Sequence, residues 1–585
     1  MGHPVIGKEP GESSRRQILH DDDVTSKPRR STAKLILVLA AVLITASAVS
    51  VGVLVGTRGK SASRNRVTSK PSRAMSRTCS KTLYPSLCLR SFLDFPGSTA
   101  ASEAELVHIS VNVSLRQAAA AVNAINDVNN LEMDTLVRSA YADCLELLDD
   151  SVDLLDRSLN ALRSGGSSPD DVATWLSAAL TNHDTCSEGF SGVSNGTVKD
   201  SVAERMKDMT ELVSNSLAIF ASTDGGGEFA GVPIGNRRRR KLLEQGEFPE
   251  WLSESDRKLL SMPVSPIRAD IIVAKDGSGT VKTIGEAIKK VPEHSTRRTI
   301  IYIKEGVYEE HNTLKIGKKK TNVMLVGDGK GKTVISGSKS VAQQLTTFHT
   351  ASFAATGRGF IAKDITFQNT AGPVKHQAVA LRIGADHAVV YRCQIIGYQD
   401  TLYVHSQRQF YRECDIYGTV DFIFGNAAVV IQKCHIYARK PLPGQKNTIT
   451  AQNRKDPNQI TGISIHASNI LATPDLEASK GTFPTFLGRP WKMYSRTVYM
   501  LCYIGDHVDP RGWLEWSGDF ALSTLYYGEY MNNGPGAGLA QRVTWPGYRV
   551  IKLETEASRF TVSHLISGSS WLPSTGVAFL SGLNT

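Results

Sequence analysis

The sequence predicts a multidomain protein in which an all-α helical bundle precedes an all-β parallel β-helix. A repeat of 20 or 21 residues runs through residues 391–441, where the segments YRCQIIGYQD, YRECDIYGTVD and IQKCHIYARKP follow one another in register. Such a period, with β-branched and aromatic residues around each cysteine, is typical of a chain whose coils lie on one another. Residues 78–223 instead place apolar side chains three and four positions apart, which is typical of amphipathic helices. The 585 residues are also too many for one ordinary domain.

The N-terminal part predicts a membrane anchor that follows a basic tail. Residues 1–34 form the tail, and residues 35–56 are 22 residues without a charge. At about 1.5 Å per residue this segment can span a bilayer core of roughly 30 Å, and it exceeds the roughly 7 to 15 residues of a signal-peptide core. We therefore expect a signal anchor. Basic residues flank both of its ends, so the downstream chain is assigned to the secretory lumen from its cysteines and from two glycosylation sequons, at Asn112 and Asn195.

Residues 70–225 are expected to form a bundle of four principal helices. The run DTLVRSAYADCLELLDDSVDLLDRSLNALR carries an apolar stripe, and WLSAALTNHDTCSEGF continues the helical pattern. A bundle buries such stripes against one another. Cys79 and Cys88 bracket a short loop in this region, whereas Cys144 and Cys186 lie in separate helical stretches. None of the eight cysteines has the Cys-x2-Cys spacing of a metal site.

Residues 226–268 are predicted to be a linker that contains protease sites. The composition changes there to Gly, Pro and charge, and the motifs RRRRKLL and RKLL stand within it. A basic run on an exposed segment is an easy protease target, although a solvated charge run is the alternative. The candidate processing residues are Arg240, Lys241, Leu242, Leu243, Arg257, Lys258, Leu259 and Leu260.

Residues 269–585 are predicted to form the β-helix, with the segment TIGEAIKKVP as a helical cap on its open end. Asp400 and Asp421 each stand seven residues after a cysteine of the repeat, so stacking at about 4.8 Å makes them neighbours. Two carboxyl groups that close cannot both ionise freely, which separates an acid from a nucleophile. Gln377 lies 22 residues before Gln399, so both amides are expected beside the pair, where they can donate to an oxyanion.

The net charge of the chain favours an acidic partner. The formal charge is +11 and the pI is about 9.1, which suits an acidic polysaccharide or a nucleic acid. No zinc-finger spacing, RNP motif or recognition helix is present in the sequence, so we expect no nucleic-acid partner. Several basic residues belong to the tail and the linker, which leaves a cationic leader with a processing site as the alternative explanation.

Four segments of the chain, HQAVAL, YQDTLY, GTVDFIFGNA and LGRPW, resemble the signatures of plant pectinesterases (pectin methylesterases). The resemblance runs from about residue 271 to the C-terminus, and it implies a right-handed parallel β-helix that hydrolyses the methyl esters of pectin and releases methanol. We expect no cofactor, and a metal-dependent lyase is disfavoured because no acidic cluster in the sequence suggests a calcium site near the pair. The helical region with its four cysteines is similar to the plant invertase and pectin methylesterase inhibitor domain. Pectinesterases with this layout are cut at basic motifs, which implies release of a mature enzyme.

The resemblance also implies a role for each residue of the site. Asp421 would attack the ester carbonyl, and Asp400 would act first as general acid and then as general base. Gln377 and Gln399 would hold the oxyanion, and Arg489 in LGRPW would hydrogen-bond Asp421. The substrate-binding residues that the resemblance implies are Thr347, Gln377, Arg489 and Trp491. Three further aromatic residues either line a sugar site or pack in the core: Tyr403, Phe422 and Trp513.

The resemblance implies three disulfides, Cys79–Cys88, Cys144–Cys186 and Cys414–Cys434. Cys393 shares the register of the last pair, at a spacing that a disulfide tolerates. The residues alone do not decide which two of these three cysteines are bonded, and only the resemblance selects the pair.

Two other functions remain as alternatives. A β-helix with paired carboxylates can be a glycoside hydrolase of pectin, although the glutamines and the arginine favour acyl chemistry. The chain can also be an inhibitor or binding protein with an inert catalytic domain.

The expected partners are methyl-esterified pectin, a processing protease and, through the anchor, the membrane. We expect a membrane-anchored precursor in the secretory pathway and a mature domain in the cell wall. We also expect the helical domain to restrain the enzyme as a zymogen until the linker is cut. The alternative role of that domain is a folding or sorting aid.

Overall fold

The computed structural model describes residues 70–193, 196–223, 268–310 and 313–584. The described residues from 71 onward belong to one compact unit that holds both the helices and the β-helix. The predicted anchor, the glycosylation site at Asn195 and both processing motifs lie outside the described residues. Asn112, the other sequon, is half-buried within a helix. No helix in the described part of the chain is long and apolar enough to cross a membrane.

The N-terminal part of the described chain is a helical bundle, as predicted. Its helices are α2 (Arg73–Cys79), α3 (Pro85–Leu93), α4 (Glu103–Asn126), α5 (Thr135–Ser164), α6 (Pro169–Gly189) and α7 (Thr197–Thr223). The four long helices pack in a ring, α4 on α5, α5 on α6, α6 on α7 and α7 on α4. Ser102 and Ser168 begin α4 and α6 with capping boxes, and Gly165 ends α5 in the left-handed region.

Two disulfides reinforce this bundle. They join Cys79 to Cys88 and Cys144 to Cys186, with Cα atoms 5.6 and 4.4 Å apart. These are the two pairs that the resemblance to the inhibitor domain implies. The second bond links α5 to α6, and both of these helices form ion pairs with the β-helix.

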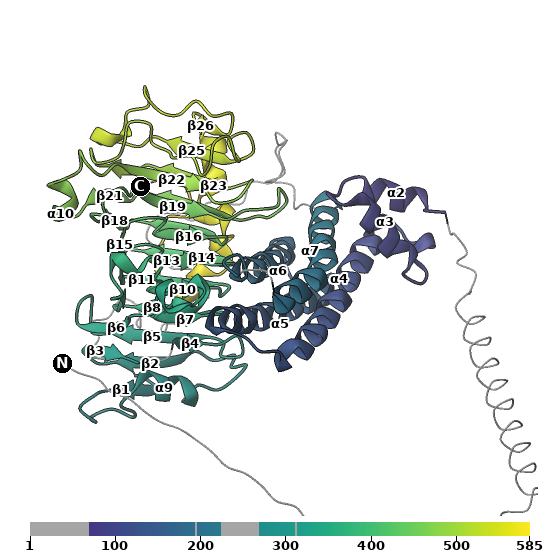
Figure 1. The fold of residues 1–585 in the computed structure, drawn as a ribbon, viewed down its shortest axis with the longest axis horizontal. Helices are drawn as coiled ribbons and strands as arrows, with labels where there is room; N and C mark the ends of the chain where they lie inside the picture. The colour runs from purple at the N-terminus through teal and green to yellow at the C-terminus, as the bar shows by residue number, and fades with distance from the viewer. Residues whose placement is uncertain (1–69, 194–195, 224–267, 311–312, 585) are drawn as a thin grey trace, which may run out of the picture. The chain divides into compact units, whose positions relative to one another are not determined.

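The C-terminal part is a parallel β-helix built from three sheets, which confirms the predicted fold (Figure 1). The eleven-stranded sheet contains, in spatial order, β1 (Ile271–Val273), β2 (Thr299–Ile303), β5 (Val323–Gly327), β8 (Ile361–Lys363), β11 (Ala388–Tyr391), β14 (Arg408–Arg412), β17 (Ala428–Gln432), β20 (Gly462–His466), β23 (Arg496–Met500), β25 (Tyr526–Tyr530) and β26 (Tyr548–Val550). The eight-stranded sheet contains β3 (Gly306–Glu309), β6 (Thr333–Gly337), β9 (Thr366–Asn369), β12 (Gln394–Ile396), β15 (Asp415–Gly418), β18 (His435–Ala438), β21 (Asn469–Ala472) and β24 (Tyr503–Ile504). The seven-stranded sheet contains β4 (Leu314–Ile316), β7 (Phe353–Ala355), β10 (Leu381–Ile383), β13 (Leu402–Val404), β16 (Ile423–Gly425), β19 (Asn447–Gln452) and β22 (Thr485–Pro490).

One-residue corners explain the repeat that the sequence shows. Arg392, Glu413 and Lys433 each stand between a strand of the eleven-stranded sheet and the cysteine that immediately precedes the next strand. All three adopt the left-handed conformation, with φ of 52°, 55° and 51°. Because the chain turns sharply at one residue, the following cysteine points into the core in every coil, and the 20- or 21-residue period is preserved.

The predicted Cys414–Cys434 disulfide is wrong in this structure. Cys393, Cys414, Cys434 and Cys502 are all buried free thiols. Cysteines in register on parallel coils point the same way, so their sulfur atoms lie one above another and do not face each other. Each thiol instead donates to a backbone oxygen two residues earlier in its own coil, Cys414 at 3.3 Å and Cys434 at 3.4 Å. The Cys414 amide in turn donates to the Cys434 sulfur at 3.3 Å.

Helices and aromatic residues close the β-helix. The predicted cap is α9 (Ile284–Lys290), which packs on β1 and β4 and adds its apolar side chains to the interior core. Phe422 and Trp513 belong to that same core, so they have a packing role. A short helix, α10 (Pro474–Glu477), lies between β21 and β22 in the chain. Two more, α11 (Glu554–Ala557) and α12 (Val562–Leu565), follow β26, and the α12 segment covers the outer face of the eleven-stranded sheet together with Trp571.

Candidate active site

The two aspartates predicted from the repeat lie on neighbouring coils. Asp400 and Asp421 each stand two residues before a strand of the seven-stranded sheet, and the first residues of those strands, Leu402 and Ile423, are paired in parallel register. The Asp400 amide also donates to the backbone oxygen of Val420 at 3.0 Å. Both aspartates are left-handed, with φ of 60° and 51°, so the chain turns at the same point in both coils. Strand stacking at about 4.8 Å therefore brings the two residues together.

Asp421 is an ion-paired carboxylate that accepts three side-chain hydrogen bonds. Arg489 on β22 donates from Nε to Oδ1 at 2.8 Å and from Nη2 to Oδ2 at 2.5 Å, which is a bidentate pair. Thr448 on β19 donates its hydroxyl to Oδ1 at 2.6 Å and accepts from the Asp421 amide at 2.9 Å. Arg489 is predicted from the sequence, but Thr448 is missed. Its coil separates it from Asp421 by 27 residues, longer than the repeat, so the period does not place it.

Asp400 is buried, and its surroundings favour the neutral, protonated form of its carboxyl group. Its side chain is 8 % exposed. Burial raises the pKa of Asp400 well above its ordinary value, the negative charge of Asp421 raises it further, and Arg489 opposes both effects. Asp400 is therefore a carboxylic acid beside a carboxylate, so it can donate a proton while Asp421 offers an electron pair.

The two glutamines lie on the coils next to the aspartates. The Ala378 amide donates to the Gln399 backbone oxygen at 3.2 Å, which joins the coil of Gln377 to the coil that carries Gln399 and Asp400. Both glutamine side chains are half-buried. The order of coils is therefore Gln377, then Gln399 with Asp400, then Asp421, as the sequence arithmetic predicts.

Two of the residues implied to bind substrate are half-buried. Trp491 follows β22 and is half-buried, with its ring centroid 6.0 Å from that of Phe424. Thr347 is half-buried in the short 3-10 helix η5 (Thr347–Thr350). A residue that the sequence did not single out, Trp516, stacks under the Arg489 guanidinium at 4.4 Å.

One row of side chains crosses the outer face of the seven-stranded sheet. Strand register aligns Lys315, Ala354, Arg382, Tyr403, Phe424, Ala451 and Arg489. We call these seven residues the outward row. Its middle is aromatic, since the Tyr403 and Phe424 rings stack with centroids 4.2 Å apart. Its two ends carry positive charge, and Arg489 at one end is the partner of Asp421.

The helical bundle packs on the outward row. Tyr403 and Phe424 share one apolar cluster with the bundle core and are only 3 % and 2 % exposed. Two residues of α6 contact the β-helix here. The Thr185 hydroxyl lies 3.0 Å from a ring nitrogen of His405, and the Asp184 carboxylate pairs with Lys455 at 2.7 Å.

Glu188 at the end of α6 lies in the same contact and pairs with Lys492. Burial raises the pKa of Glu188 to about 7, with a further contribution from Asp184, while Lys492 and Lys455 oppose the shift. The Glu188 carboxyl group is therefore buried in the contact between the bundle and the aromatic part of the outward row.

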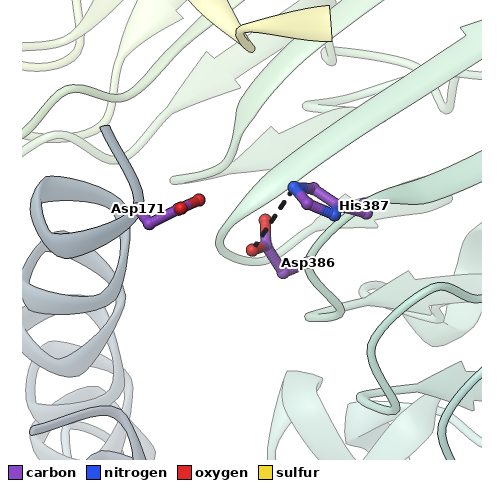
Figure 2. A group of neighbouring side chains, drawn as sticks. All are labelled: Asp171, Asp386 and His387. Carbon is purple, nitrogen blue, oxygen red and sulfur yellow. Dashed lines mark ion pairs between the residues drawn. The ribbon is translucent and has the colours of Figure 1, made fainter. Parts of the chain in front are cut away.

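One cluster in the described chain has the side chains of a metal site. Asp171, Asp386 and His387 bring one ligand atom each within 4.8 Å of one another, and Figure 2 shows Asp171 on a helix facing the other two on a loop. Arg408 already donates to Asp386 at 2.7 and 2.9 Å and to Asp171 at 2.6 Å. A guanidinium therefore supplies the positive charge at this place, and we assign no metal to it.

Comparison with known families matches both parts of the chain. Residues 270–569 match the Pectinesterase family, and residues 73–219 match the family described as Plant invertase/pectin methylesterase inhibitor. The first match covers the coils with both aspartates, both glutamines and the arginine. The second covers the helical bundle.

Individual proteins are similar over all or part of the chain. The probable pectinesterase/pectinesterase inhibitor 61 of Arabidopsis thaliana is 60% identical over 100% of both chains. The probable pectinesterase/pectinesterase inhibitor 34 of the same plant is 65% identical over 88% of this chain and 86% of its own. Among solved structures, a pectin methylesterase from carrot is 56% identical with a TM-score of 0.53, and the match covers 54% of this chain and 99% of the carrot chain.

Proposed function

Because this chain belongs to the pectinesterase family, we propose that it hydrolyses the methyl esters of pectin and that Asp421 and Asp400 carry the reaction. The observation that supports these roles most strongly is the division of charge between the two residues. Arg489 donates two hydrogen bonds to Asp421, and Asp400 beside it has a raised pKa. The glutamine coils lie next to the pair, where their amides can donate to an oxyanion.

The first half of the reaction forms an acyl enzyme. An Asp421 oxygen attacks the ester carbonyl carbon, and the carbonyl electrons move to the oxygen, which the side-chain amides of Gln377 and Gln399 hold. When this intermediate collapses, the bond from carbon to the methoxy oxygen breaks. Asp400 gives its proton to that oxygen, and methanol leaves. Asp421 is then joined to the uronate as an anhydride, and Asp400 is a carboxylate.

The second half restores both aspartates. Asp400 takes a proton from water, and the water oxygen attacks the acyl carbon. The bond to Asp421 breaks and Asp421 leaves as a carboxylate, again paired with Arg489. The products are a free uronate carboxyl group and one methanol, and Asp400 is protonated for the next turnover.

Product analysis tests this function against its alternatives. With methyl-esterified pectin, we expect methanol and new carboxyl groups in equal amounts and no new reducing ends. New reducing ends without methanol would identify a glycoside hydrolase, since that reaction cleaves the sugar backbone. An inert binding protein would release neither product.

We also propose that the helical bundle restrains the enzyme in the uncut chain. Its contact with Tyr403 and Phe424 supports this, because those rings lie on the strands that begin just after the two aspartates. Tethering makes the local concentration of the bundle high, on the order of millimolar for a short flexible linker. Replacing residues 237–241 and 257–258 by alanine removes both predicted cutting sites. We expect that chain to stay uncut and to release little methanol, whereas full activity of the uncut chain would make the bundle a folding or sorting aid.

We place the reaction outside the cell, in the plant cell wall. The two disulfides of the bundle suit the oxidising secretory route. Residues 35–56 would anchor the precursor in the membrane, and a processing protease would cut the linker to free the β-helix part. Protease treatment of intact membrane vesicles tests this arrangement, because it predicts that the bundle and the β-helix are protected together inside the vesicle.

A further inference from the structure

A hollow of about 330 Å³ lies where the chain enters four neighbouring strands of the eleven-stranded sheet, β2, β5, β8 and β11. The residues that turn the chain there are left-handed, with φ of 52° at His294, 56° at Asn322, 75° at Gly359 and 56° at His387. The catalytic aspartates instead precede strands of the seven-stranded sheet, so the hollow is at a different corner of the coils. Pockets that take small molecules measure about 300–1,000 Å³, so the hollow has room for one.

Every side chain in the lining that can carry a charge is basic. These side chains are Arg298, Arg358, His294 and His387. No aspartate or glutamate of the described chain lines the hollow. The carboxylate next to His387 in the sequence, that of Asp386, is already paired, because it accepts from Arg408 at 2.7 and 2.9 Å. Two guanidinium groups around an opening without a carboxylate favour an anionic ligand.

Arg358 has donors that a ligand can use. It is exposed, and its guanidinium makes no hydrogen bond or ion pair with another residue in the described part of the chain. Its place is fixed by the backbone, because the Asn322 amide donates to the Arg358 backbone oxygen at 2.8 Å. A guanidinium presents several N–H groups in a rigid fork, which matches the oxygens of an anion.

Hydrogen bonds fix the loop that carries Arg298 against the next two coils. The Thr321 hydroxyl and the Asn322 side-chain amide both donate to the Ser295 backbone oxygen, at 2.7 and 2.9 Å. Arg298 donates from Nη1 to the Gly359 backbone oxygen at 3.0 Å. This wall is therefore in place before a ligand arrives, which lowers the entropy cost of binding.

Two stacked rings give the hollow an apolar part. His387 and Trp571 both line it, with ring centroids 4.7 Å apart and ring planes 9° apart. Trp571 donates from Nε1 to the Ile566 backbone oxygen at 2.8 Å, so it offers ring surface and no donor. Ser574 and Thr575, from the same C-terminal segment, complete this side of the lining. A ligand that fills the hollow therefore has an organic body beside its charged group.

We propose that this hollow binds a small organic molecule that carries a phosphate group. Phosphate has two negative charges for the two arginines, whereas a carboxylate has one, and a guanidinium binds phosphate oxygens in pairs. The organic body would pack against His387 and Trp571. A bound ligand would join the corners of the coils to the C-terminal segment and so hold that segment on the eleven-stranded sheet. The site does not rest on the proposed function, because neither aspartate of the catalytic pair lines it.

Calorimetry on the full chain with phenyl phosphate tests the ligand class. At about pH 8 this probe carries two charges, because the second pKa of a phosphate is about 6. Benzoate and phenol have the same ring with one charge and with none. We expect phenyl phosphate to bind, phenol not to bind, and benzoate to displace phenyl phosphate only at a concentration at least about tenfold higher. Displacement at equal concentrations would overturn the phosphate class, and no binding of phenyl phosphate would overturn the site.

Arg358→Gln tests the place of binding. This variant should weaken phenyl phosphate binding roughly tenfold or more, because it removes hydrogen bonds between two charged groups. Arg297→Gln is the matched control, since Arg297 is exposed, pairs with Asp270 at 2.9 Å and does not line the hollow. Its affinity should stay close to the native value at constant ionic strength. An equal loss in both variants would indicate general attraction to a basic surface and contradict the site. Both arginines are exposed, so we expect both variants to melt at the native temperature in the absence of the probe.

Amide hydrogen exchange of the full chain locates the bound probe independently. Saturating phenyl phosphate should slow exchange in residues 568–576, which include Trp571, because the ligand ties this segment to the coils. Exchange in residues 399–402 and 419–423, which include the two aspartates, should not change. Slower exchange confined to those two catalytic segments would place the probe at the active site and rule out the hollow. Unchanged exchange in residues 568–576 at saturation would also contradict the proposal.

Discussion

Asp421 is oriented by side chains from two different coils. Arg489 fixes both of its carboxylate oxygens, and the Thr448 hydroxyl donates to the oxygen that already accepts from Arg489 Nε. The remaining lone pairs of that carboxylate are directed by these contacts, which is how a weak nucleophile is oriented before the substrate arrives. Thr448 is therefore a positioning residue for the reaction.

Thr448→Val should lower kcat while the protein stays folded. A hydrogen bond to a charged group contributes about 1.5–3 kcal/mol, which corresponds to a fall of about ten- to a hundredfold if it acts in the transition state. Thr450→Val on the same strand is the matched control, because Thr450 donates to the Leu487 backbone oxygen at 2.9 Å and does not touch Asp421. Steady-state methanol release measures both variants. Equal kcat values for the two would remove Thr448 from its role.

At the scale of the element, the left-handed corner residues and the buried thiols keep the coils in register. Each of these cysteines contributes a small apolar side chain to the core and a thiol that satisfies a backbone oxygen. The stack therefore holds the coils in place through packing and hydrogen bonds, without a covalent bond.

Alkylation of the unfolded, unreduced protein should label four thiols. Cys393, Cys414, Cys434 and Cys502 are free, and the other four of the eight cysteines form the two bundle disulfides. Peptide mass mapping reads the adducts directly. A Cys414–Cys434 linked peptide, with only two labelled thiols, would restore the pairing that the resemblance implies.

The sequence predicts what repeats and does not predict what lies outside the repeat. The 20- or 21-residue period places Asp400 beside Asp421, since each coil has the same corner. It also places the three cysteines in register, but it does not select a pair; the resemblance did, and the structure leaves all three as free thiols. Thr448 follows a coil of irregular length. The bundle contacts join residues more than 160 positions apart, such as Glu146 and Lys315, and no local pattern connects them.

At the scale of the whole molecule, the bundle and the β-helix meet through carboxyl groups in an apolar contact. Burial raises the pKa of Glu188 to about 7 and that of Asp150 to about 6. Both groups return to ordinary pKa values if the bundle leaves and water reaches them. The contact between the two parts therefore depends on pH.

We expect the bundle to be held more tightly as the pH falls from about 7 towards 4.5. The contact raises the pKa of Glu188 from its ordinary 4.5 to about 7, so the packed state binds a proton that the released state lacks in this range. One such proton strengthens the contact by at most about 1.4 kcal/mol per pH unit, and this gain is lost as the pH rises through 7. Amide exchange of α6 at pH 5 and pH 8, corrected for the intrinsic rate, measures the change.

Glu188→Gln is the control for this pH effect. The amide keeps the size of the side chain and cannot titrate, so the difference between pH 5 and pH 8 should shrink to the smaller contribution of Asp150. An undiminished difference in this variant would assign the pH dependence to other groups of the contact.

Methanol release by the released β-helix part carrying Asp421→Asn tests the account most directly. The amide keeps the shape of the side chain but cannot act as nucleophile, so turnover should fall roughly 10⁴-fold or more. Asp415→Asn is the matched control, because Asp415 pairs with Lys330 at 2.9 Å on the eight-stranded sheet and should leave the rate unchanged. If folded Asp421→Asn protein released methanol within tenfold of the native rate, the acyl-enzyme account would be contradicted.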